Sequence, residues 1–119
     1  MSKRDDIDLL YDIQEAIRTI LSYSSEFTFN QFLKDRQTKD AVIRNFEIIG
    51  EASKSASEKL KTRYKDIEWK EMARFRDKLL HHYFGIDYAL VWDVIRDILP
   101  SMIIQINEAI LKESKGDRA

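Results

Sequence analysis

The chain has 119 residues and a formal net charge of −1, with 34% charged residues, three glycines, one proline and no cysteine. This length fits a single domain, and so little glycine and proline argues against a turn-rich all-β fold. The lack of cysteine excludes disulfides and thiolate metal sites. No apolar run approaches the roughly 20 residues that span a bilayer, and the charged start is unlike a signal peptide, so we expect a cytoplasmic protein with no membrane contact.

Two helices are predicted in the first third of the chain. Apolar residues recur at helical spacing between Ile7 and Leu21 and form one stripe. The pair Ser24-Ser25 interrupts this stripe, and Thr28 is a suitable N-cap for a short second helix that runs through Leu33.

A third, longer helix is expected from about Lys39 to Leu60, because apolar residues keep a helical period throughout this segment. Gly50 lies in its interior, where glycine costs about 1 kcal/mol relative to alanine. A glycine at such a position indicates either the close approach of another helix or a kink, and we expect the close approach. A basic loop, Lys61 to Asp66, follows.

The C-terminal half is predicted to continue as helices. A fourth helix starts at Ile67-Glu68-Trp69 and runs to about Tyr83, after which Gly85 interrupts the pattern. Asp87 is a suitable N-cap for a fifth helix, and Pro100 starts or kinks a final helical segment.

These elements and their short connections predict an all-α fold, an antiparallel four-to-five-helix up-and-down bundle. We place the domain at residues 1–113 and expect residues 114–119 to be a frayed tail. Trp69, Trp92 and Phe84 are expected to be core or interface anchors, because no interleaved basic and aromatic pattern supports base stacking.

Positive charge is concentrated in one segment. Residues 59–78 carry eight basic against four acidic side chains, whereas the segments before and after them are net negative. The basic segment ends just before the only two histidines, His81 and His82. Taken alone, a solvated helix end and loop is the simpler interpretation of this charge.

The stretch from Arg74 to Gly85 holds the residues most suited to catalysis. Neighbouring histidines on a helix point about 100° apart, so His81 and His82 cannot share one metal ion, and no phosphate-loop or nucleophile-elbow motif is present. Metal-free RNA cleavage by attack of a ribose 2′-OH needs only a base, a cation and a bound polyanion. His81 can transfer the proton, Arg76 can hold the phosphate oxygens, and the Tyr83 hydroxyl can bind phosphate.

One ideal helix does not bring these groups together. At about 100° per residue, Arg76 and Tyr83 share a face, while His81 lies about 140° away from Arg76. Either the helix unwinds near Gly85 or a second copy of the chain supplies the missing groups. A symmetric homodimer is the simpler solution, and isologous dimers are the commonest assembly.

The spacing Arg76-x-x-x-x-His81-x-Tyr83 resembles the signature of HepT-like proteins in the HEPN superfamily. Asp77 fits the polar position after the arginine, although many members have asparagine there. Three flanking segments are also similar to the family, namely residues 44–52 with their Ile-Gly-Glu-Ala run, residues 67–69, and residues 83–92.

This resemblance implies a HEPN-like homodimer with a metal-independent endoribonuclease site at the dimer interface and no cofactor. Arg76 and His81 are the expected catalytic residues, and Tyr83, Asp77 and Lys78 are expected to bind substrate phosphate. Glu51 is a candidate supporting residue across the helix pair, although a solvated glutamate fits its position nearly as well.

The resemblance further implies a toxin of a toxin–antitoxin pair that acts on RNA. Its partner would be the small nucleotidyltransferase antitoxin MntA, which silences such toxins by transferring AMP to the motif tyrosine, here Tyr83. A non-catalytic nucleotide-binding or adaptor subunit of a nucleotidyltransferase complex stays open as the alternative.

Overall fold

The computed structural model describes residues 5–81 and 85–116, and within these ranges all regular structure is helical. The all-α bundle predicted from the sequence is confirmed, but the described residues form seven helices instead of four or five. In chain order they are α1 (Asp6–Ser24), α2 (Phe29–Lys34), α3 (Arg36–Ser55), α4 (Glu58–Arg63), α5 (Trp69–Leu80), α6 (Tyr88–Asp97) and α7 (Leu99–Gly116).

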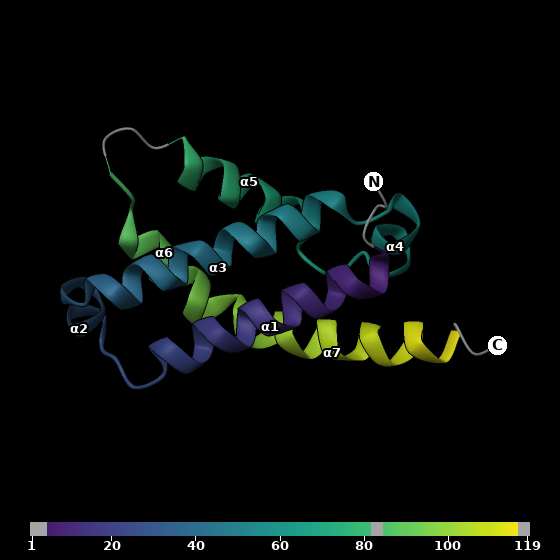
Figure 1. Cartoon of the computed structure of the whole chain (residues 1–119), viewed down its shortest axis with the longest axis horizontal. Coiled ribbons are helices and arrows are strands. Elements are labelled where there is room, and N and C mark those ends of the chain that lie inside the picture. The colour runs from purple at the N-terminus through teal and green to yellow at the C-terminus, as the bar shows by residue number, and fades with distance from the viewer. Residues whose placement is uncertain (1–4, 82–84, 117–119) are drawn as a thin grey trace.

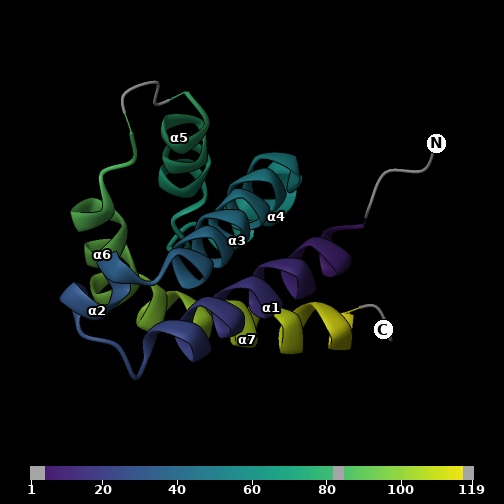
Figure 2. The ribbon, with the colours of Figure 1, turned by 60° about the vertical axis from the view of Figure 1, so that its left-hand side comes forward.

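The four longest helices, α1, α3, α5 and α7, form the body of the bundle. Helix α1 packs against both α3 and α7, and α5 packs chiefly on α3 at the edge of the bundle. Neighbouring members of this set run in opposite directions, with α2 and α6 at one end and α4 at the other (Figures 1 and 2). This arrangement makes α3 the helix that connects α5 to the rest of the core.

The core lies where α1, α3 and α7 meet. Leu10, Ile13, Ile17, Phe46 and Ile106 are completely buried there. Burying a side chain of this size contributes about 1.5–3 kcal/mol, so these contacts supply the main stability of the bundle.

Aromatic contacts join the outer helices to this core. The Phe46 and Phe75 rings meet edge to face at 5.1 Å and connect α3 to α5, a preferred geometry for aromatic pairs. Trp69 is buried and its indole N–H donates to a backbone oxygen at the end of α4. Trp92 packs against the two phenylalanine rings of α2. Both tryptophans are therefore anchors, as predicted, while Phe84 lies outside the described residues.

The predicted third helix from Lys39 to Leu60 is wrong at its C-terminal end. Helix α3 stops at Ser55, and Ser57 begins a separate helix by capping α4 through its side chain. Asp6 fixes this break, because its carboxylate accepts hydrogen bonds from the Ser57 backbone N–H at 3.0 Å and from the hydroxyl at 2.5 Å. The predicted basic loop at residues 61–66 is consequently helical over its first half.

Other boundaries agree with the sequence more closely. Thr28 and Asp87 cap α2 and α6 through their side chains, as predicted. Pro100 is the second residue of α7 and so starts that helix, a position where its missing N–H costs nothing. Gly85 has φ of +113°, a conformation that favours glycine.

Helix α7 continues to Gly116, so residues 114–116 are helical, and the fraying expected of the tail stays a prediction. An anchor lies just before this last turn. Arg63 donates two hydrogen bonds to the Glu113 carboxylate at 2.6 and 2.7 Å, and the Tyr64 hydroxyl donates a third at 2.6 Å.

None of the described helices is long and apolar enough to span a membrane.

Candidate functional site

The site begins with an unusually close contact between α3 and α5. A Cβ atom built on Gly50 would lie 2.1 Å from the Cβ of Arg76 and 3.0 Å from the backbone oxygen of Met72. Real Cβ contacts are never that short, so the two helices meet at a point where only glycine fits. The predicted close approach at Gly50 is confirmed, and it places Arg76 directly against α3.

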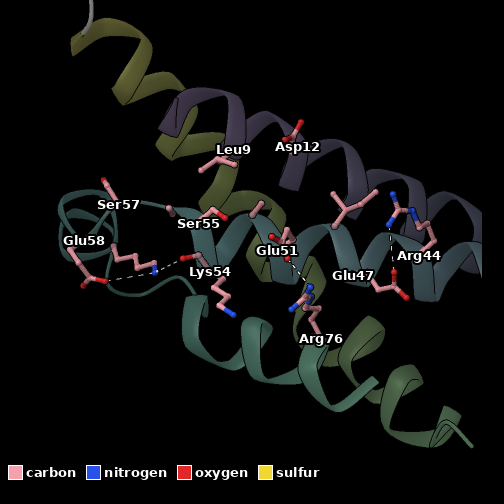
Figure 3. A pocket seen from close by; sticks show the side chains of 14 residues that line it. Leu9, Asp12, Arg44, Glu47, Glu51, Lys54, Ser55, Ser57, Glu58 and Arg76 are labelled. Atoms are coloured by element: carbon pink, nitrogen blue, oxygen red, sulfur yellow. Dashed lines mark hydrogen bonds and ion pairs between the residues drawn. The ribbon is translucent and has the colours of Figure 1, made fainter. Parts of the chain in front are cut away.

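Arg76 is held by two carboxylates at this contact. Its Nη2 lies 2.8 Å from a Glu51 oxygen on α3, and its Nη1 lies 3.0 Å from an oxygen of Asp77. The Arg76 side chain is 22% exposed, whereas both carboxylates are more than half exposed. Figure 3 shows Arg76 rising from α5 toward Glu51 across the gap between the helices.

Arg76 and Glu51 line a hollow of about 930 Å³, here called the Arg76 hollow. Residues of α1, α3 and α4 form most of its wall, and Arg76 is the contribution of α5. Its charged side chains have both signs: Arg44, Lys54, Lys61 and Arg76 face Asp12, Glu47, Glu51 and Glu58. The hollow therefore offers cations to an anionic ligand only where they are not already paired with carboxylates.

His81 lies at the C-terminal end of α5, three residues after the last cation of the basic segment, Lys78. It is exposed and is the C-cap of the helix, and its backbone N–H donates to the Asp77 oxygen at 3.0 Å. No hydrogen bond or ion pair joins His81 to Arg76 in the described part of the chain, and His81 does not line the Arg76 hollow. One copy of the chain thus holds the two predicted catalytic residues on one helix without bringing them together.

The remaining predicted site residues have different positions. Glu51 contacts Arg76, so its expected placement across the helix pair is what the structure has. Asp77 contacts Arg76 as a neighbour on α5, and Lys78 is exposed on the same helix. Tyr83 and His82 lie outside the described residues, so the phosphate-binding and AMP-accepting roles expected of Tyr83 have no structural description.

The arrangement around Arg76 has a clear chemical consequence. Both terminal nitrogens of the guanidinium already have carboxylate partners. Exposed ion pairs of this kind are worth only about 0–1 kcal/mol, so a phosphate, which matches the guanidinium fork well, can replace them. Arg76 is therefore held in place at rest and is still available to a phosphodiester.

Two cations of the Arg76 hollow, Arg44 and Lys54, were not predicted from the sequence as site residues. Lys54 lies three residues after Glu51 and Arg44 seven before it, which places all three on one face of α3; that spacing was a usable signal. The described residues contain no group of three or more His, Cys, Asp or Glu side chains suited to a metal ion.

The chain matches a family model described as Ribonuclease HepT-like over residues 13–109. A candidate RNase of Methanocaldococcus jannaschii is 45% identical over 117 residues, covering 98% of this chain and 96% of the relative. A candidate ribonuclease HepT of Thermococcus cleftensis is 47% identical over 100 residues, covering 84% and 91%. A second candidate RNase of M. jannaschii is 38% identical over 102 residues, covering 86% and 94%. The search of solved structures gave no significant match.

Proposed function

The chain belongs to the HepT-like ribonuclease family and is an RNA endonuclease, and from this premise we propose that it cleaves RNA without a metal ion, as a homodimer. The ribose 2′-oxygen attacks the adjacent phosphorus while His81 takes its proton. The bond to the 5′-oxygen breaks, and that oxygen receives a proton. The products are a 2′,3′-cyclic phosphate and a 5′-hydroxyl.

One observation carries this proposal: Arg76 is held tightly against Gly50 of α3, beside an open hollow. A guanidinium held in place before substrate arrives stabilises charge that develops on the phosphate oxygens without further reorganisation. Asp77 orients this guanidinium, and Lys78, exposed on the same helix, adds a mobile positive charge near the substrate.

A second copy completes the site in this proposal. His81 is separated from Arg76 within one chain, and the neighbouring Leu80 is a large apolar side chain that is 46% exposed. An isologous contact between the ends of two α5 helices would cover Leu80. It would also bring His81 of one copy toward Arg76 of the other.

The test is incubation of the pure protein with RNA in excess EDTA. We expect new ends with 2′,3′-cyclic phosphate, and a loss of about 100-fold or more in rate for Arg76→Ala and for His81→Ala. Arg74→Ala is the matched control, because Arg74 is exposed on the same helix and has no described contact. Cleavage by His81→Ala at the rate of the unmodified protein would disprove the role of His81.

We further propose that the protein is the toxin of a toxin–antitoxin pair whose antitoxin is an MntA-like nucleotidyltransferase. Transfer of AMP to the Tyr83 hydroxyl would add a bulky anion two residues after His81 and repel the RNA phosphate. Incubation with such an enzyme and ATP should add one AMP to the protein, release one pyrophosphate and stop cleavage. Tyr83→Phe should neither accept AMP nor be silenced.

A further inference from the structure

We infer that a second hollow, formed by the ends of α3, α4 and α5, binds backbone phosphates of the RNA substrate at a distance from the cleaved bond. This inference rests on the proposed function. The hollow has a volume of about 440 Å³ and is here called the basic hollow. Its charged residues are Lys54, Lys61, Lys65 and Lys70, with Glu58 and Glu71.

Most of the positive charge in the basic hollow is uncompensated. Lys61 is 3.8 Å from Glu58, so these two form an ion pair. Lys54, Lys65 and Lys70 are exposed, and no ion pair to any of them is found among the described residues. Three free lysines against one remaining glutamate, Glu71, suit a ligand with repeated negative charges.

The floor of the basic hollow has unused hydrogen-bonding groups. Ser53 is completely buried, and its hydroxyl has no partner in the part of the chain that the structure describes. The first residues of α5, Trp69 to Glu71, also line the hollow, and this helix start has no side-chain cap. The Trp69 N–H donates to the Ile67 oxygen, whereas the N–H groups of Lys70 and Glu71 have no partner among the described residues. Uncapped backbone N–H groups at a helix start favour an anion.

The basic hollow continues into the Arg76 hollow. Lys54, Glu58 and Lys61 line both of them. Figure 3 shows the Lys54 side chain and Arg76 extending into the same gap between α3 and α5. A chain of phosphates bound at Arg76 can therefore continue past Lys54 toward Lys65 and Lys70.

Binding measurements test this inference. In the His81→Ala background, which keeps the RNA intact, the triple variant Lys54→Gln, Lys65→Gln, Lys70→Gln should bind a single-stranded RNA of about 15 nucleotides at least tenfold more weakly. Each phosphate contact contributes about 0.7 to the slope of log K against log salt for single strands. Loss of three contacts should reduce that slope by about 2.

The matched control removes the same charge elsewhere. Arg18, Lys34 and Lys115 are exposed on α1, α2 and α7 and line none of the hollows. The triple Gln variant at these positions should change the dissociation constant by less than twofold. Equal losses in the two triple variants would mean that net charge alone matters and would overturn the inference.

Cleavage assays distinguish a failure of this inference from a failure of the proposed function. With His81 intact, the loss in the lysine triple variant should fall on KM for the long RNA and should disappear for a dinucleotide, which is too short to reach the basic hollow. If the unmodified protein cleaves RNA and the lysine variant matches its control, only the inference fails. If the lysine variant keeps RNA affinity and loses affinity for an acidic protein partner, the hollow is a protein-docking surface and the inference is also wrong.

Discussion

Arg76 has to exchange partners during the reaction proposed here. At rest its two terminal nitrogens contact Glu51 and Asp77, and a phosphodiester must replace at least one of these carboxylates. Glu51 thus acts in two opposite ways: it competes with RNA for the guanidinium, and it keeps the guanidinium facing the Arg76 hollow. Changing this residue separates the two effects.

Glu51→Gln should tighten RNA binding severalfold, because a neutral amide competes less well for the guanidinium. It should also lower kcat, because the orientation of Arg76 is less fixed. Binding is measured with the His81→Ala background and kcat with His81 intact. Folding stability should change by less than about 1 kcal/mol, since the Glu51 carboxylate is more than half exposed and Arg76 keeps Asp77 as a partner. Weaker RNA binding would show that Glu51 does not compete with the substrate.

The sequence predicted the identity of these residues better than their arrangement. The signature spacing identifies Arg76 and His81, and the Ile-Gly-Glu-Ala run identifies Gly50 and Glu51. Helical spacing within α5 cannot reveal which residue of α3 meets Arg76, because that contact depends on how two helices pack. The same spacing did predict that His81 and Arg76 lie on different faces of one helix.

Among the contacts between helices, that of α3 with α5 has the strictest steric requirement, at Gly50. Gly50→Ala should lower stability, although alanine normally favours a helix over glycine by up to about 1 kcal/mol. The added Cβ would overlap the Arg76 Cβ at 2.1 Å, and overpacking of this kind costs about 1–3 kcal/mol. The melting temperature and the cleavage rate should both fall, because α5 must move away and take Arg76 with it.

Gln37→Ala is the control for this helix. Gln37 is exposed in the first turn of α3 and lines none of the hollows, so its replacement should leave both measurements nearly unchanged. A Gly50→Ala variant that melts at or above the temperature of the unmodified protein would contradict the steric account of this contact.

The anchor between α4 and α7 should make stability depend on pH. Burial alone would raise the pKa of the Glu113 carboxyl, but hydrogen bonds from Tyr64 and Arg63 outweigh it and hold the pKa below its ordinary value of 4.5. A carboxyl whose pKa is lower in the folded than in the unfolded state stabilises the fold at pH values above its unfolded pKa. This stabilisation is lost as pH falls through its folded pKa. The Tyr64 pKa is raised to about 12, chiefly by burial, so its contribution is lost only as pH rises from 10 toward that value.

Glu113→Gln should therefore destabilise the protein near pH 7 and much less in acid. Urea unfolding of both proteins between about pH 3 and pH 7 measures this difference. The difference in the free energy of unfolding should be largest near neutral pH. It should shrink as pH falls below 4.5, because the Glu113 carboxyl is then increasingly protonated in the unfolded state. A difference that stays constant across this range would mean that the charge of Glu113 is irrelevant to the anchor.

Contacts between residues far apart in the chain explain why some element boundaries could not be predicted. Apolar periodicity runs without interruption from α3 into α4, whereas at the break after Ser55 the Ser57 N–H donates to Asp6, which is 51 residues away in the chain. The last turns of α7 are joined likewise to Arg63 and Tyr64 through Glu113. Local spacing predicts helices well, but it contains no information about such distant hydrogen bonds.

At the scale of the whole molecule, the proposed catalytic site requires two copies of the chain. The single chain measures 49 × 29 × 25 Å, and its exposed Leu80 and His81 lie at one end of α5. If a second copy covers them, each site consists of Arg76 from one protomer and His81 from the other. That division can be tested without a structure of the dimer.

The most direct measurement mixes Arg76→Ala and His81→Ala protomers and assays RNA cleavage in EDTA. Neither variant alone should cleave, but random pairing gives heterodimers in half of the molecules, each with one intact site out of two. The mixture should therefore recover about a quarter of the activity of the unmodified protein, as expected for an isologous interface. A mixture that forms heterodimers, as shown by native mass spectrometry, and still cleaves no RNA would contradict the shared site.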